Sequence, residues 1–201
     1  PFETKHQWFR SAIAMSRVPW EMGHESIVCR RERLLDESFP QWSKIGAVPL
    51  SFRKIFRFTI DDRGHRGLDA GGVAREYFSS LVDELFEDGA ARKDDVSSGG
   101  GAARPRLFVR GTSAEAVTYQ IRPHPHPEKL DPSILRRYRF AGQVLAKAVY
   151  DGHTVAAHLS RPILAHLTGL PTGPKDLREY DDALHRQLEW LRALPESEAE
   201  T

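Results

Sequence analysis

The strongest pattern in the chain is an alternating segment followed by a helical repeat. From 55 to 60 the side chains of Phe56, Phe58 and Ile60 share one face, which predicts a half-buried strand. The residues 61–64 have the composition of a turn. Apolar residues then recur at four-residue spacing, which predicts an amphipathic helix over about 71–86. Its two apolar rows are Val73, Tyr77, Leu81 and Leu85, and Ala74, Phe78, Val82 and Phe86.

A second strong helix is predicted from Asp131 to about Tyr150. Asp131 is a typical N-cap residue, and Pro132 suits the first helical turn. Small residues, Gly142 among them, keep the middle of this helix slim, so that neighbouring elements can approach closely. Weaker helical spacing predicts further helices at 2–16, 34–42 (limited by Pro40), 162–168, 174–180 and 181–194.

The remaining apolar segments are short and predict strands. They lie at 27–29, 107–110 and 117–121. Together with the helices they predict an α+β, mainly helical fold, a helical body with a few short antiparallel strands. We expect one domain over 1–194, containing a flexible Gly/Ser-rich insertion at 87–106 and followed by a frayed or truncated tail at 195–201.

Composition narrows the class of protein. The chain has 201 residues, with 29 Lys and Arg against 28 Asp and Glu, so its net charge of +1 gives no reason to expect nucleic acid or an anionic membrane as a partner. No apolar run approaches the roughly 20 residues that a membrane helix needs. A single cysteine excludes a disulfide framework and favours an intracellular setting, cytoplasmic or nuclear. Because the first residue is proline rather than methionine, we expect a fragment of a longer protein.

Glycines at the corner between the predicted strand and helix offer a possible anion site. Gly67, Gly71 and Gly72 precede the helix, and backbone N–H groups at such an end attract phosphate. The segment lacks both a Gly-Lys-Ser/Thr ending and a Gly-x-Gly-x-x-Gly spacing, and Asp69 would repel a phosphate. We therefore favour a structural corner, in which Asp69 caps the helix and the glycines permit positive φ and close packing.

Three further groups could carry chemistry, and each has a plainer interpretation. Cys29 has two arginines after it, but no His–Asp pair is tied to it by spacing, so a buried structural thiol is favoured over a nucleophile. His124 and His126 could chelate a metal, but no third ligand is evident, so neither a metal nor another cofactor is expected. Arg75 and Glu76 form either a solvated face or an organiser of a turn or interface.

Two blocks of sequence together resemble the HECT ubiquitin ligase family. Residues 67–78 are similar to the family's Gly-x-Asp-x-Gly-Gly-x-x-Arg-Glu-aromatic-aromatic segment. Residues 138–151 are similar to its Phe-x-Gly-Arg-x-x-x-x-Ala-aromatic helix, although Gln143 replaces the usual arginine. Supporting matches at 28–39 and 176–191 follow in the same order, and the resemblance covers about 2–194. Arg110 stands near the place where some members have an aromatic residue that contacts a second ubiquitin.

The resemblance implies a ubiquitin-protein transferase. Such enzymes take ubiquitin from a conjugating enzyme as a cysteine thioester and pass it to lysines of a protein substrate, which makes those three proteins the expected partners. The larger N-lobe docks the conjugating enzyme, and the smaller C-lobe carries the cysteine. This chain resembles the N-lobe alone, in particular its large subdomain. We therefore expect no catalytic residue in it, with Cys29 outside any catalytic position of the family, and no activity of the chain by itself.

The matching positions are accordingly expected to be structural. They are Gly67, Asp69, Gly71, Gly72, Arg75, Glu76, Phe140, Gly142, Ala148 and Tyr150. Two other hypotheses stay open at this point. One is a non-catalytic protein-binding module derived from a HECT lobe, and the other is a small-molecule enzyme that uses the glycine-rich corner.

Overall fold

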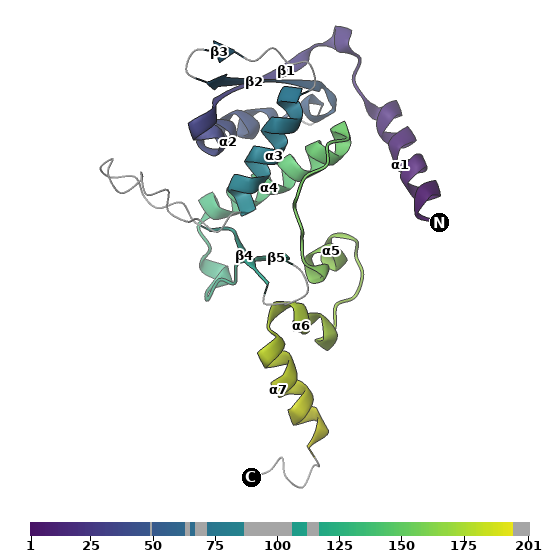
Figure 1. Ribbon diagram of the computed structural model, residues 1–201, viewed down its shortest axis with the longest axis vertical. Coiled ribbons are helices and arrows are strands. Elements are labelled where there is room, and N and C mark those ends of the chain that lie inside the picture. Colours follow the sequence, from purple (N-terminus) through teal and green to yellow (C-terminus); the bar gives the residue numbers. More distant parts are fainter. Residues whose placement is uncertain (49, 63–64, 67–71, 87–105, 112–116, 195–201) are drawn as a thin grey trace, which may run out of the picture. The chain divides into compact units, whose positions relative to one another are not determined.

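A computed structural model describes residues 1–48, 50–62, 65–66, 72–86, 106–111 and 117–194 (Figure 1). The chain divides into two compact units, Pro1–Leu85 with Leu130–Ala156, and Phe86–Lys129 with Ala157–Thr201. The expected insertion, except for Arg106, and the expected tail lie outside the described residues. The assignment of 1–194 to one partial domain stays a prediction.

The first unit contains a three-stranded sheet. Strand β1 (His24–Arg30) pairs in parallel with β2 (Ile55–Asp62), and β3 (His65–Arg66) pairs antiparallel with the end of β2. The expectation of antiparallel strands is therefore wrong for β1 and β2. Helix α2 (Leu34–Ile45) lies in the connection between them and carries the chain back to the end from which β1 started, so β2 runs in the same direction.

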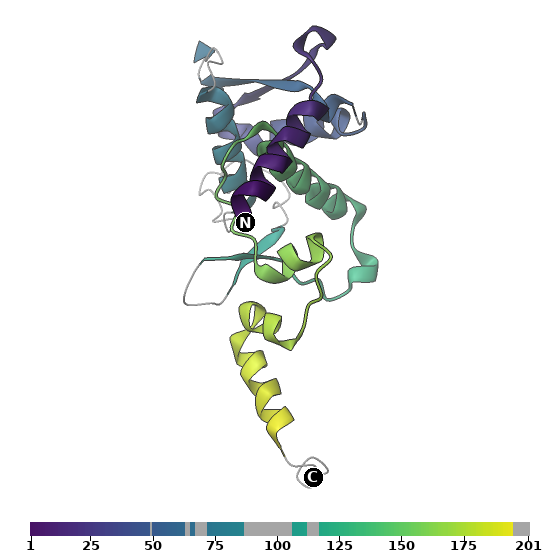
Figure 2. The ribbon, with the colours of Figure 1, turned by 90° about the vertical axis from the view of Figure 1, so that its right-hand side faces the viewer.

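Three helices lie on one side of this sheet, as Figures 1 and 2 both show. They are α2, α3 (Gly72–Phe86) and α4 (Pro132–Asp151). The mainly helical α+β class is thus confirmed. Helix α4 begins as predicted, since the Asp131 carboxylate accepts a hydrogen bond from the backbone N–H of Ser133 at 2.7 Å. It ends at Gly152, whose φ of 82° is left-handed.

The core of this unit is built around one indole. The Trp42 ring from α2 makes edge contacts with Phe56 of β2, Phe78 of α3 and Phe140 of α4, at centroid distances of 5.3, 6.4 and 5.9 Å. These four side chains are all at least 96% buried. The Phe58 ring adds a stacked contact with Tyr77 at 4.2 Å. The predicted inward face of β2 and the predicted apolar rows of α3 are therefore confirmed.

Helix α1 (Phe2–Ser16) has the bounds that the sequence predicts, but none of its residues is buried. Trp8 and Met15 are 72% and 89% exposed. Its end is fixed to α4, because the Ser16 hydroxyl lies 3.1 Å from the hydroxyl of Tyr150. The following Arg17 donates to the carbonyl of Tyr150 at 3.1 Å.

The second unit combines a small antiparallel sheet with short helices. Strands β4 (Phe108–Arg110) and β5 (Tyr119–Ile121) pair with each other, and the Phe86 ring stacks on Phe108 at 4.3 Å. Three helices follow, α5 (Arg161–Leu167), α6 (Leu177–Tyr180) and α7 (Asp182–Ala193). The 3₁₀ turns of the two units are η1 (Trp20–Met22), η2 (Arg31–Arg33), η3 (Ser51–Arg53), η5 (Pro127–Lys129) and η6 (Pro174–Asp176).

The apolar stripe of α7 is not buried against the described elements. Leu184, Leu188 and Leu191 are between 40% and 53% exposed. No helix in the described part of the chain is long and apolar enough to cross a membrane.

Candidate functional site

Only the last residue of the glycine-rich corner, Gly72, belongs to the described part of the chain. Gly67, Asp69 and Gly71 lie outside the described residues, so neither the phosphate hypothesis nor the capping hypothesis is tested there. Gly72 is the first residue of α3. Arg75 is exposed, and Glu76 forms an ion pair with Arg31 of η2. Because both partners of that pair are more than 40% exposed, it contributes little stability.

The matching positions on α4 divide between core and surface. Phe140 and Ala148 are buried, and the Phe140 ring also meets Phe39 edge-on at 5.4 Å. Gly142 is exposed, and a Cβ atom added there would meet nothing within 4 Å. Gly142 is therefore not needed for a close approach, contrary to the expectation for this helix. Tyr150 is half-buried and joins α4 to the end of α1.

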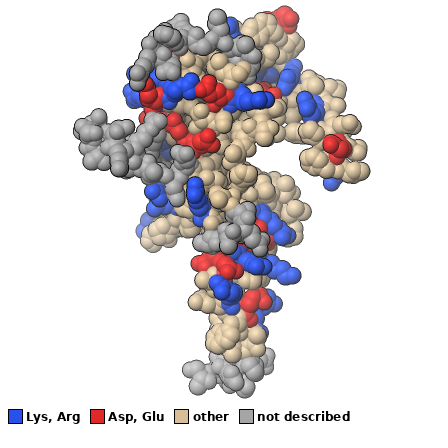
Figure 3. Space-filling model, viewed as in Figure 1, with Lys and Arg blue, Asp and Glu red and all other residues tan. Residues whose placement is uncertain are grey.

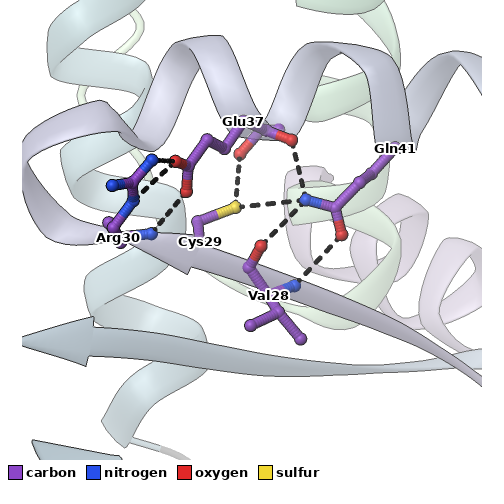
Figure 4. A network of polar contacts seen from close by, with 6 residues as sticks. Val28, Cys29, Arg30, Glu37 and Gln41 are labelled. Atoms are coloured by element: carbon purple, nitrogen blue, oxygen red, sulfur yellow. Dashed lines mark hydrogen bonds and ion pairs between the residues drawn. The ribbon is translucent and has the colours of Figure 1, made fainter. Parts of the chain in front are cut away.

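Cys29 on β1 sits in a polar network that joins the strand to α2 (Figure 4). Its Sγ lies 3.3 Å from the Ser38 hydroxyl and 3.6 Å from the side-chain amide of Gln41. Gln41 also bridges the backbone N–H and carbonyl of Val28, at 3.1 and 2.9 Å. Next to it, the carboxylate of Glu37 accepts from Arg30.

The environment of Cys29 suppresses its reactivity. Only 2% of the residue is exposed. Burial raises the pKa of the thiol, and the nearby Glu37 carboxylate raises it further, against the hydrogen bonds from Ser38 and Gln41. A nucleophilic cysteine needs the thiolate form and access to its substrate. The expected burial of Cys29 is confirmed, and the arrangement suits a structural thiol.

A second buried cluster surrounds Lys147 on α4. The side chain is wholly buried, yet its ammonium group donates to the carboxylate of Asp151 at 2.9 Å and to the carbonyl of Lys54 at 2.8 Å. It also lies 4.4 Å from the centre of the Phe56 ring, a cation–π contact. Burial lowers the pKa of Lys147, and Asp151 opposes that shift. The cluster joins α4 to the start of β2.

Sequence reasoning missed this lysine, although a signal for it exists. Lys147 follows Phe140 by seven residues and Val144 by three, so it falls on the buried stripe of α4. Asp151 lies four residues further on, which places a carboxylate within reach of a lysine on the same helical face. A charged residue inside an apolar stripe, with an opposite charge at i+4, therefore indicates a buried ion pair.

The described residues hold no group of three or more His, Cys, Asp or Glu side chains that could bind a metal ion. His126 lies 3.4 Å from Glu128, and both side chains are more than 60% exposed. Basic and acidic side chains are interspersed on the face that Figure 3 shows. The two buried clusters fix strands to helices, and neither combines a nucleophile with a general base.

Comparison with known proteins shows the family to which the chain belongs. A profile of the HECT-domain (ubiquitin-transferase) family matches residues 101–201. The chain is 29% identical over 165 residues to the E3 ubiquitin-protein ligase TOM1-like of Neurospora crassa, which covers 81% of the chain and 3% of that protein. It is 26% identical over 191 residues to the E3 ubiquitin-protein ligase ptr1 of Schizosaccharomyces pombe, which covers 94% of the chain and 5% of that protein.

The E3 ubiquitin-protein ligase RSP5 of Chaetomium thermophilum is a further relative, shorter than the other two. The chain is 27% identical to it over 191 residues, 94% of the chain and 20% of that protein. The chain belongs to the HECT-domain family, whose members among these relatives are E3 ubiquitin ligases. It spans between 3% and 20% of the length of the three relatives.

Proposed function

We propose that this chain is the structural N-lobe portion of a ubiquitin-protein transferase whose catalytic cysteine lies outside these 201 residues. In the whole protein, ubiquitin passes from a conjugating enzyme to that cysteine and then to lysines of a protein substrate. The chain by itself is inactive, and the whole protein works inside the cell.

The state of Cys29 is the observation that carries this proposal. It is the one cysteine in the sequence, and a HECT thioester requires a cysteine. Its thiol is buried, its pKa is raised, and its Sγ contacts a hydroxyl and an amide, rather than a group that could deprotonate it. Family membership combined with an unreactive thiol favours a scaffold that positions partners for chemistry elsewhere.

The proposal is tested by a thioester assay with fluorescent ubiquitin, a conjugating enzyme and the full-length protein. Cys29→Ala should leave the rate of thioester formation within about twofold of the unsubstituted protein, because Cys29 touches no reacting atom. The 201-residue chain should form no adduct that a reducing agent removes. Circular dichroism of the variant shows whether its fold is retained.

Two results would overturn the proposal. One is a reducible ubiquitin adduct on Cys29 of the isolated chain. The other is a folded Cys29→Ala full-length protein that no longer forms the thioester while Gln41→Leu still forms it. Because Gln41 contacts the same sulfur without being a nucleophile, Gln41→Leu serves as a control for disturbance of the network. A loss seen with both variants would reflect local packing rather than chemistry at the thiol.

A further inference from the structure

A groove of about 560 Å³ runs along β2 in the first unit. Six consecutive residues, 53–58, line it, so both faces of the beginning of the strand contribute. Trp20 of η1 and Tyr150 at the end of α4 add aromatic rings to its wall. Its size is within the range of ligand-binding clefts.

The groove carries excess positive charge. Four of its lining residues are cationic, Arg17, Arg53, Lys54 and Arg57, and Asp151 is the acidic one among those described. Asp151 is already neutralised by Lys147 behind the wall. Lys54 is likewise paired, with Glu25 at 3.1 Å.

Three arginines therefore remain to face the groove without an acidic partner in the described part of the chain. The Arg17 guanidinium lies over the Tyr150 ring at 5.8 Å, and that of Arg57 lies over the Trp20 ring at 5.9 Å. Arg53 is exposed. Guanidinium groups held against aromatic rings keep their N–H edges available for carboxylates. The charge of the groove is thus complementary to an acidic ligand.

The backbone of β2 adds a second feature. Strand β1 pairs with one edge of β2 along Ile55–Asp61, whereas on the other edge β3 pairs only with Asp61 and Asp62. Among the described residues, no strand pairs with the start of β2 on that second edge. A strand edge without a paired neighbour presents N–H and C=O groups that an extended peptide can use.

From this combination we infer that the groove binds an extended, acidic segment of a partner protein, which adds as a strand along the open edge of β2 near Arg53 and Arg57. Ile55 and Arg57 share one face of the strand, so the neighbouring positions of an added strand favour an apolar and an acidic side chain in alternation. This interaction is distinct from the proposed transferase chemistry, and either can fail without the other.

A peptide accounts for the lining better than a membrane or a free anion does. Half of the positions that line the groove are apolar or aromatic, and these would find no counterpart among the headgroups of a flat lipid surface. A small anion would use the arginines but neither the strand edge nor the rings. An acidic peptide uses all three.

Binding is measured by fluorescence anisotropy of the fluorescein-labelled peptide (Glu-Glu-Val-Val)₂ with the 201-residue chain. The double variant Arg53→Glu/Arg57→Glu should raise the dissociation constant at least about tenfold. The matched control Arg136→Glu/Arg139→Glu, on exposed positions of α4 in the same unit, should change it by less than about twofold. A peptide with N-methyl groups on alternate amides should also bind at least about tenfold more weakly, because it cannot complete the strand pairing.

Amide chemical shifts of the unsubstituted chain locate the peptide without any substitution, and should change most between Ile55 and Arg57. The inference is overturned if the peptide does not bind, or if both double variants weaken it equally, since that result means general charge attraction. If the N-methylated peptide binds as tightly as the unmodified peptide, strand pairing does not contribute, and the groove is an anion site only. Vesicles of phosphatidylserine that bind through Arg53 and Arg57 when the peptide does not would assign it to a membrane instead.

Discussion

The indole nitrogen of Trp42 donates a hydrogen bond to the hydroxyl of Tyr77 at 2.8 Å, in a region where both side chains are at least 99% buried. The Tyr77 hydroxyl in turn donates to Ser38 at 2.7 Å, and Ser38 contacts the thiol of Cys29. A continuous polar chain therefore crosses the aromatic core and joins α2, α3 and β1. Such a chain stabilises the fold only while every member keeps its partner.

Removing the hydroxyl of Tyr77 tests this relationship. In Tyr77→Phe the buried Trp42 N–H loses its acceptor, and we expect a loss of about 1–3 kcal/mol in the free energy of unfolding. Urea unfolding followed by tryptophan fluorescence measures it. Tyr150→Phe is the matched control, because that hydroxyl is only half-buried and its partner Ser16 can turn to water. Equal losses in the two variants would contradict a special role for the buried chain.

The two faces of β2 should respond very differently to truncation. Phe58 is 2% exposed, whereas Ile55 is 43% exposed. We expect Phe58→Ala to lower the free energy of unfolding by about 3–5 kcal/mol through the cavity that it leaves among aromatic rings. Ile55→Ala should cost less than about 1 kcal/mol. Chemical denaturation of both variants provides the measurement, and a larger cost at Ile55 would mean that the inward face is misassigned.

The same strand shows what sequence could predict and what it could not. Period-two alternation is a local property, so it revealed which side of β2 is buried. The direction in which β2 pairs depends on where α2 returns the chain, and no local pattern encodes that path. Pro40 illustrates a related limit. It was expected to restrict α2, yet the helix continues through it to Ile45, because tertiary burial of Trp42 and Ile45 outweighs the lost hydrogen bond.

The candidate site likewise has features that the sequence could predict and features that it could not. The burial of Cys29 followed from its apolar neighbours, but its contacts with Ser38 and Gln41 depend on how α2 lies against β1. The groove at Arg53 and Arg57 was not predicted at all. Its wall comes from separate segments that lie between Arg17 and His153 in sequence, and mixed charge along the chain gave no sign that three arginines would gather there.

Gly142 inside α4 and Gly152 directly after it should respond in opposite ways to alanine. Gly152 ends the helix with φ of 82°, which strains any residue that has a Cβ atom, so Gly152→Ala should cost about 1 kcal/mol. Gly142 lies inside the helix, and an added Cβ meets nothing within 4 Å. Gly142→Ala should therefore stabilise the protein by about 0.5–1 kcal/mol. Thermal unfolding of the pair decides it, and destabilisation by Gly142→Ala would show that this family position needs its glycine for packing.

Glu37 should give the stability a defined dependence on pH. Hydrogen bonds from the side chain and backbone of Arg30, both at 2.8 Å, lower the pKa of the Glu37 carboxyl below its ordinary value of 4.5. A carboxyl with a lowered folded-state pKa stabilises the fold above the unfolded value, and that contribution disappears as pH falls through the folded value. Glu37→Gln should therefore flatten the decline in stability below about pH 4.5.

Urea unfolding at a series of pH values checks this expectation. Arg30→Ala should flatten the same interval only in part, because the backbone N–H at position 30 still donates to Glu37. The double variant should flatten it no further than Glu37→Gln alone does. An unchanged slope in both single variants would mean that other carboxyls control the acid limb.

Lys147 carries a charged ammonium group on a wholly buried side chain of α4. Lys147→Ala removes the stem beneath the Phe56 ring and leaves the Asp151 carboxylate without its partner, so we expect a loss of about 3–5 kcal/mol in the free energy of unfolding. Lys147→Met keeps a chain of similar length in the same space. It should cost at least about 1 kcal/mol less, because its stem still fills the space beneath the Phe56 ring, whereas the loss of the partner of Asp151 is the same in both variants. Equal costs, measured by urea unfolding, would show that the charge pair rather than packing of the stem dominates, and would make this buried cation the element that fixes α4 to β2.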